Sequence, residues 1–464
     1  MNALQEMKGN KTYEEWIQSL DLERGRGSPQ GGSRSSEADW LHALRRKAYE
    51  RFKTLGFPNR KSEAWKYLHL EPLLKTSFAL PARQTELSAE KIQEIKKSFL
   101  ASNENRLVFV NGRCRQDLSA AHLPEGSKLQ NLGEALKNGD PILTAYLGRG
   151  IENETNAFTA LNASNFQEGV YLSLAKDARV ENPIELIFVA ADSGSPLVFY
   201  PRIFVFLETG AQAEVVTHYL DLTRNVYFMN AAAEIYLGKN TKLRWTNVHL
   251  EGSGANSFLN TQCHLQEKSV FERAAFFHGG ALTRDEVNVD FEAENASCAL
   301  SGLAALSGNS QVFHHATVRH RAGHCTSRQV YKNILAGRAQ AEFNSLVHVL
   351  RDAPQSNSEQ LDKNLLLSDS ARAYSRPQLR IDNDDVQCNH GATTGQLAKD
   401  ELFYLQSRGL DKNLARQVLI FSFAQEVLDK ILFLPLRRRL EQWAQATIQG
   451  MIKNGKANAY DPRP

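Results

Sequence analysis

Glycines recur at a nearly constant interval through the middle of the chain, and this spacing restricts the folds that the chain can adopt. Seven of the ten glycines between residues 200 and 350 fall on one grid, with intervals of 28, 14, 28, 28, 15 and 14 residues. They are Gly210, Gly238, Gly252, Gly280, Gly308, Gly323 and Gly337. The skipped grid points hold Gln266-Glu267 and Glu294-Asn295, which also suit turns.

A unit of about 14 residues accommodates one strand and one turn, so two units form a coil of about 28 residues. Between the turns lie short apolar segments that are typical of strands, such as IELIFVAA, IFVFLETG and AEFNSLVHVL. Regular turns predict a stacked β-solenoid, because each coil buries its apolar side against its neighbours. A β-sandwich is the alternative, but its turns recur about every 8–12 residues. The longer interval favours the solenoid.

Helical patterns flank this β region. ADWLHALRRKAYERFKTLGFP has apolar residues at helical spacing and ends in Gly56 and Pro58, whereas residues 24–39, rich in Gly, Ser, Arg and Pro, predict a flexible loop. The last helical segment carries an apolar stripe, formed by Leu436, Leu440, Trp443, Ala444, Ile448 and Met451. We therefore predict a mainly helical N-terminal domain over 1–155, a β core over 156–396 and a helical C-terminal domain over 397–464.

Charge and composition exclude several classes of protein. Lys plus Arg number 55 against 52 for Asp plus Glu, so no strong field draws the chain to nucleic acid or to a membrane surface. We expect Arg437, Arg438 and Arg439 to form a solvated helix face. No stretch approaches the roughly 18 apolar residues of a membrane span. With a polar start and five scattered cysteines, the expected location is the cytoplasm.

The segment DDVQCNHGATTGQL (Asp384–Leu397) holds a cysteine and a histidine two residues apart. Alternate residues of a strand share a face, so Cys388 and His390 would present a sulfur and an imidazole side by side. Such a pairing can lower the pKa of the thiol, and thiolate and imidazole are both iron ligands. Two ligands make an incomplete site that needs a second subunit. On spacing alone, a buried cysteine beside a hydrogen-bonded histidine is the favoured interpretation.

A second cluster comprises His314, His315, His320, His324 and Cys325. Its density indicates a zinc site, but strand alternation sends His314 and His315 to opposite faces. His320 and His324 have H-x-x-x-H spacing, but no C-x-x-C pair completes a tetrahedral set, so solvent-facing or structural histidines are the favoured interpretation. The chain has no G-x-x-x-x-G-K-[ST] phosphate loop and therefore should not hydrolyse ATP by that route.

Several longer segments resemble the SufB/SufD family of iron–sulfur cluster assembly proteins. They are HCTSRQVYKNIL, NLLLSDSARAYSRPQLRI, CNHGATTGQL and ELFYLQSRGL, together with GFPNRKSEAWKY and NPIEL near the N-terminus. The resemblance touches nearly the whole chain, and the residues that follow the cysteine are most similar to those of SufD-like members.

The resemblance implies a right-handed parallel β-helix with helical regions at both ends. It implies a heterodimer with a SufB-like subunit, formed through the last strands of the β-helix. It assigns His390, with Cys388 beside it, to cluster formation together with a cysteine from the SufB-like chain. The C-terminal helices would bind a SufC-like ABC ATPase, for which we select Phe403, Leu405, Leu419 and Phe423.

The expected function is that of a non-catalytic scaffold on which a transient iron–sulfur cluster forms. A cysteine desulfurase system would supply sulfur through the SufB-like subunit, and reduced flavin is an associated factor in some such complexes. Two other functions fit parts of the sequence. One is an exported β-solenoid lyase or hydrolase acting on polysaccharide, and the other is a stand-alone zinc-binding protein that uses the segment His314–Cys325.

Overall fold

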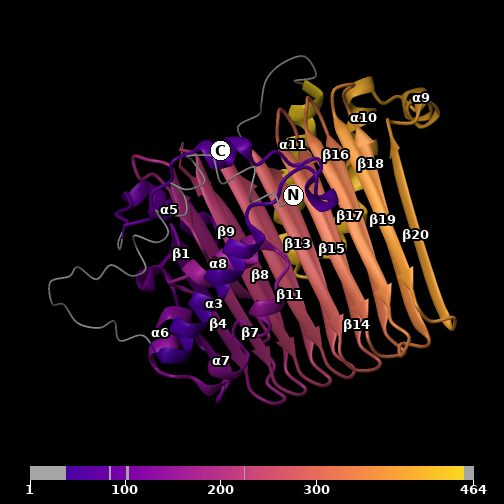
Figure 1. The fold of residues 1–464 in the computed structure, drawn as a ribbon. Coiled ribbons are helices and arrows are strands. Elements are labelled where there is room, and N and C mark those ends of the chain that lie inside the picture. The colour runs from indigo at the N-terminus through magenta and orange to yellow at the C-terminus, as the bar shows by residue number, and fades with distance from the viewer. Residues whose placement is uncertain (1–37, 83–84, 101–103, 224, 454–464) are drawn as a thin grey trace.

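Two long, mainly parallel sheets face each other across one core, and the chain passes from one to the other at every turn (Figure 1). The computed structural model describes residues 38–82, 85–100, 104–223 and 225–453. In spatial order, the first sheet contains β2 (Arg113–Cys114), β1 (Arg106–Val110), β5 (Ile184–Ala191), β8 (Gln212–Leu222), β10 (Lys242–Glu251), β12 (Val270–Gly279), β14 (Ser297–Leu306), β16 (Thr326–Leu335), β18 (Ser356–Leu366) and β20 (Val386–Gly395).

The second sheet runs in the order β19 (Arg372–Ile381), β17 (Gln340–Val349), β15 (Gln311–His320), β13 (Leu282–Phe291), β11 (Ala255–Leu265), β9 (Tyr227–Leu237), β7 (Arg202–Leu207), β4 (Gly169–Leu174) and β3 (Lys128–Asn131), with β6 (Leu197–Phe199) beside β9. Asn256 pairs with Phe228 and Val270 with Lys242, each 28 residues apart. All seven grid glycines and both skipped grid points lie in turns between strands. The predicted solenoid with coils of about 28 residues is confirmed.

One corner of the coils repeats an unusual backbone conformation. Its non-glycine residues with positive φ are Asn240, Lys268, Asn295, His324 and Gln355. Each donates its backbone N–H to a carbonyl of the following coil, as in the bond from His324 to Pro354 O (2.9 Å) and that from Gln355 to Asp385 O (2.6 Å). This corner ladder satisfies the turn amides, and it gives His324 a structural position.

The interior of the solenoid changes character along its length. In the middle coils it holds stacked rings, with His249 between Tyr219 (4.4 Å) and Phe277 (4.6 Å). In the last coils the inward positions of β18 are polar yet buried. These are Ser356, Ser358, Gln360, Asp362 and Asn364.

Most of the N-terminal region lies against the outer face of the second sheet (Figure 1), whereas its helix at Ala89–Ser98 packs on the first sheet beside β1 and β5. Helix α3 (Asp39–Leu55) turns Leu41, Leu44, Ala48 and Phe52 inward and ends at Gly56, as predicted. The other helical elements of this region are η1 (Glu63–Trp65), α4 (Glu71–Lys75), α5 (Ala89–Ser98), η2 (Gln116–Leu118), α6 (Leu132–Lys137), α7 (Pro141–Tyr146), η3 (Ile151–Asn153) and α8 (Ala157–Asn165). Residues 24–37 of the predicted loop lie outside the described residues, and Asp39 begins α3.

The C-terminal region consists of α9 (Lys399–Ser407), α10 (Lys412–Leu428) and α11 (Leu434–Lys453). Asp411 caps α10 by accepting from the backbone N–H groups of Asn413 (2.9 Å) and Leu414 (3.1 Å). The predicted apolar stripe of α11 packs with α10 against the outer face of the first sheet, on a core that includes Val216, Val248, Phe276 and Ile334. None of the residues of α9 is buried.

The arginine run differs from its prediction. Arg438 is exposed, but Arg439 is half-buried and donates from its guanidinium to Ser98 O (2.6 Å) and Phe99 O (3.0 Å). The carbonyl groups at the end of a helix have no partner within the helix, so Arg439 satisfies the end of α5 from α11. Within the described ranges, no helix has the length and apolar character needed to cross a bilayer.

A candidate site at the open end of the solenoid

The two ends of the solenoid are built differently. At one end, the short strands β2 and β3 run antiparallel to β1 and β4. At the other end, among the described strands, β20 pairs with β18 alone and β19 with β17 alone (Figure 1). These two edge strands are 10 residues long each. Long edge strands with free backbone groups tend to pair with another chain. We call this region the open end.

Cys388 and His390 lie on the inward face of β20, at the open end. In the parallel register, Cys388 is opposite Ser358 and His390 is opposite Gln360, and both β18 residues are buried. Cys388 is half-buried and packs against the interior core, whereas His390 is exposed. The structure thus brings the sulfur and the imidazole to one face, at a place that another chain can reach.

The thiol of Cys388 is not activated in the isolated chain. Burial raises its pKa above the ordinary value of 9.0, and a backbone contact with Ser358 offsets only part of this effect. At neutral pH the group is therefore a protonated thiol, contrary to the expectation that the neighbouring imidazole lowers its pKa. A bound metal ion would remove this proton, because it stabilises the thiolate.

Polar side chains line the interior directly behind the pair. Ser358 accepts a hydrogen bond from Ser327 (3.1 Å), whose hydroxyl also lies 2.9 Å from His320 Nε2. Burial raises the pKa of Asp362 to about 6. Ser358, Gln360 and Asp362 were not predicted from the sequence to lie at this site. The available signal was a polar residue at every second position of SNSEQLDKN, in a segment that had to form a strand with one face inward.

The histidine-rich segment does not form one site. His314 points into the interior between Phe277 (5.0 Å) and Tyr331 (4.9 Å), and His315 lies on the outer face near Arg284. His320 is buried beside Ser327, and the buried Cys325 lies 3.3 Å from Ala293 O. No three His, Cys, Asp or Glu side chains in the described part of the chain gather as metal ligands. The segment therefore supplies no zinc site.

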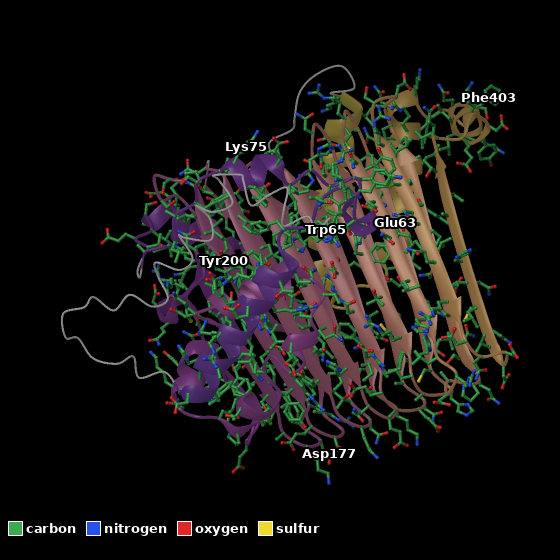
Figure 2. All side chains as sticks on the ribbon, in the orientation of Figure 1. Glu63, Trp65, Lys75, Asp177, Tyr200 and Phe403 are labelled. Carbon is green, nitrogen blue, oxygen red and sulfur yellow. The ribbon has the colours of Figure 1, made fainter. Side chains whose placement is uncertain are left out.

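The four selected residues of the C-terminal helices have different environments. Phe403 is 73% exposed on α9, and Figure 2 places it at the margin of the molecule. Leu405 and Leu419 are half-buried. Phe423 packs on the solenoid instead, with its ring 4.6 Å from Lys332 Nζ, so it is a poor candidate for a partner contact. Three further apolar side chains of α9 and α10 are exposed, namely Tyr404, Leu414 and Val418.

Comparison with known proteins gives consistent matches along the chain. The family model described as SUF system FeS cluster assembly, SufBD core domain, matches residues 188–423, and that of the SufBD protein N-terminal region matches residues 32–186. The iron-sulfur cluster assembly SufBD family protein slr0076 of Synechocystis is 30% identical over 400 residues, covering 84% of this chain and 87% of that protein.

Two named members of the same group also match. The iron-sulfur cluster assembly protein SufD of Escherichia coli is 29% identical over 378 residues, which is 81% of this chain and 86% of that protein. The iron-sulfur cluster assembly protein SufB of Bacillus subtilis is 22% identical over 411 residues, which is 84% of this chain and 85% of that protein.

Proposed function

Because the chain belongs to the SufBD family of iron–sulfur cluster assembly proteins, we propose that it is a non-catalytic scaffold subunit of a SufBCD-type complex. Its relatives support a role in iron–sulfur cluster assembly. One observation supports the scaffold role most directly. Among the described strands, the solenoid ends in β19 and β20, each of which has one edge without a strand partner. A cysteine and a histidine lie side by side on β20.

The proposed partner at the open end is a SufB-like subunit. Its own strands would pair with the free edges of β19 and β20, which supply main-chain hydrogen bonds along both sheets. Pairing there would cover the interior face of β20 and exclude water from Cys388 and His390. The partner would also supply the ligands that two side chains alone cannot provide.

Iron and sulfur are the substrates of this site. His390 offers an imidazole nitrogen to iron, and Cys388 becomes a ligand once the bound metal displaces its thiol proton. Sulfur would reach the interface as persulfide from a cysteine desulfurase system through the SufB-like subunit. Its conversion to the sulfide of a cluster takes two electrons, which reduced flavin bound in the complex would supply. The scaffold holds the two side chains on a rigid strand, which fixes their separation while the cluster forms.

The C-terminal helices are the proposed contact with a SufC-like ABC ATPase. Phe403 and Tyr404 on α9 and Leu414 and Val418 on α10 are large apolar side chains that remain exposed. Such side chains commonly anchor interfaces. Closure of the ATPase dimer would draw the helices of the two scaffold subunits together. Helix α10 packs on β14 and β16, so this movement would be transmitted to strands near the open end.

The test is a His390→Ala chain produced with its SufB-like and SufC-like partners. We expect the complex to assemble normally and the yield of reconstituted cluster to fall at least tenfold. His348→Ala is the matched control, because His348 lies on the outer face of β17 and pairs with Asp382 (2.8 Å). A normal cluster yield with His390→Ala would remove the site assignment. Loss of assembly with His390→Ala would assign His390 to the interface instead.

A further inference from the structure

We propose that Gln360 is a positioning residue for His390, and that its side-chain oxygen accepts the N–H of the imidazole. The other ring nitrogen is then left with its lone pair toward iron. This inference rests on the proposed function, because it concerns the same site. It adds a residue one strand deeper in the solenoid, with a role in orienting the histidine.

The register places the two residues side by side. His390 of β20 is opposite Gln360 of β18 in the parallel ladder, and both point to the inner face. Adjacent strands lie about 4.8 Å apart, so a glutamine side chain can reach a histidine ring at this position. Gln360 is only 1% exposed. Its amide is therefore shielded from solvent beneath the exposed imidazole.

Hydrogen bonds to Ser345 on the facing strand β17 fix the orientation of the Gln360 amide. Its Nε2 donates to the backbone carbonyl of Ser345 (3.2 Å) and to Ser345 Oγ (2.7 Å). The backbone carbonyl of Ser345 can only accept a hydrogen bond, so the amide group of Gln360 must turn its nitrogen, and not its oxygen, toward Ser345. The hydroxyl of Ser345 in turn donates to Gln329 Oε1 (2.7 Å). These bonds hold the Gln360 nitrogen toward β17 and leave the oxygen free for another donor.

That oxygen has no hydrogen-bond partner among the described residues. Buried carbonyl oxygens are nearly always paired. Among the described residues, the Nε2 of Gln329 on the deeper strand β16 is also unpaired, but it makes no hydrogen bond to this oxygen. His390 is the residue next to it on the neighbouring strand. Histidines that bind a metal usually donate their other ring N–H to a carbonyl or carboxylate, which fixes the tautomer and the ring plane.

A partner that covers the open end would complete this arrangement. In the isolated chain His390 is exposed, so water can satisfy both ring nitrogens. Once the partner excludes water, the acceptor nearest in the register is Gln360 Oε1. We therefore expect one neutral tautomer of His390 in the assembled complex. Gln360 does not bind iron in this arrangement and acts only through the imidazole.

The direct test measures the tautomer of His390 in the unsubstituted complex. The chain is labelled with ¹⁵N-histidine, assembled with its SufB-like and SufC-like partners without iron, and studied by solid-state NMR at pH 8. The signals of His390 are identified by their loss in His390→Ala. One protonated and one bare ring nitrogen, with a single set of shifts, is the expected result. An even mixture of the two neutral tautomers of His390 in the unsubstituted complex would overturn the inference, so this test needs no variant of Gln360.

A variant of Gln360 separates positioning from packing. Gln360→Met keeps the length but removes the acceptor, and we expect mixed tautomers and a 10- to 100-fold loss in cluster yield. Gln262→Met is the control, because Gln262 is a partly buried glutamine on β11 that donates to Asp290 (2.8 Å) and takes no part in the bonds around Gln360. It should leave the tautomer unchanged.

The outcomes distinguish this inference from the proposed function. If His390→Ala impairs cluster formation while Gln360→Met changes neither tautomer nor yield, only the role of Gln360 is wrong. If Gln360→Met lowers the yield without altering the tautomer, its role is structural and the inference also fails. If His390→Ala leaves the yield normal, the site assignment fails and the inference fails with it.

Discussion

The rings of Tyr67 and Tyr374 stack with their centroids 3.8 Å apart and their planes 10° from parallel. Tyr67 follows η1 in the N-terminal region, and Tyr374 belongs to the edge strand β19. Glu63 forms an ion pair with Arg376 on the same strand, and Arg376 also donates to the backbone carbonyl of Glu63 (3.2 Å). Residues 63–67 therefore form a strap that ties the N-terminal region to the open end, over the outer face of the second sheet (Figure 2).

Tyr67→Ala should loosen this strap. A stacked aromatic pair contributes about 1 kcal/mol beyond the area that it buries, so we expect the free energy of unfolding to fall by about 1–2 kcal/mol. The loss should be local at first, with faster amide hydrogen exchange in β19 than in β13. Tyr404→Ala is the control, since Tyr404 is 57% exposed on α9. Unchanged exchange in β19 would contradict the role of the strap.

Glu342 should make stability depend on pH. It is fully buried on β17, with His315 Nε2 3.4 Å away, and burial raises its pKa from 4.5 to about 7 although Arg284 and Arg376 partly oppose this. Between these values the folded state keeps a proton that the unfolded chain has lost. The contribution of Glu342 to the free energy of unfolding should therefore fall as pH rises from 4.5 to 7, by about 3 kcal/mol at most. Buried histidines contribute with the opposite sign, because burial lowers the pKa values of His218, His314 and His320.

Urea unfolding at several pH values tests this expectation with Glu342→Gln. The free energy of unfolding of the variant should increase more with pH between 4.5 and 7 than that of the unsubstituted chain, because only the smaller opposing contribution of Asp362, whose pKa is raised to about 6, remains. Glu359→Gln on the exposed face of β18 serves as the control and should leave the slope intact. A slope as steep in Glu342→Gln as in the unsubstituted chain would refute the assignment.

Lys332 fastens helix α10 to the solenoid. Its side chain is 5% exposed, and its Nζ donates to Phe423 O (2.9 Å) and to Glu426 Oε2 (2.5 Å). Lys332→Met removes both bonds and keeps the length, so we expect a loss of about 2 kcal/mol. Limited proteolysis should then cut α10 earlier than the strands. Lys430 is exposed just after the same helix, so Lys430→Met should not make α10 easier to cleave. Equal cleavage of α10 in the two variants would argue against a role of Lys332 in anchoring the helix.

The exposed apolar residues of α9 should carry binding of the ATPase. Phe403→Ser combined with Tyr404→Ser should weaken binding of a SufC-like protein at least tenfold in a titration, because anchor aromatics dominate such interfaces. The melting temperature should not change, since α9 buries none of its residues. Leu432→Ser removes a similarly exposed side chain, 50% accessible, from the turn between α10 and α11. If Leu432→Ser weakened binding of the SufC-like protein as much as the double change in α9, the position of Phe403 and Tyr404 would not matter, and any exposed apolar side chain of this region would serve.

The repeat in the middle of the chain was readable from the sequence because turns constrain the backbone more tightly than strands constrain side chains. Gly280, Gly308 and Gly337 have positive φ, a conformation that favours glycine, so their spacing records the coil length. The pairing of one coil with the next is less constrained by residue type. The polar inner face of β18 was therefore missed, since polar residues in a strand ordinarily indicate solvent.

Other features depend on contacts between distant segments. The partners of Arg439 are two backbone carbonyls at the end of α5, and no local pattern in α11 reveals them. Phe423 was selected as a partner contact, but its ring packs against the buried Lys332 of β16, so it faces the solenoid. The strand position of Cys388 and His390 followed from alternation alone. Their accessibility followed only from the place of β20 at the end of the stack.

The corner ladder also determines how the stack of coils stops. Gln355 donates its N–H to Asp385 O, and the register of Ser356 with Val386 gives the equivalent place in the last turn to the N–H of Asp385. That group bonds instead to the side chain of Asn383 (2.9 Å), within its own turn. An asparagine amide thus replaces the carbonyl that another coil would have offered. The series of corner hydrogen bonds therefore ends inside this chain, and it leaves the edges of β19 and β20 as the backbone groups that a partner could still pair with.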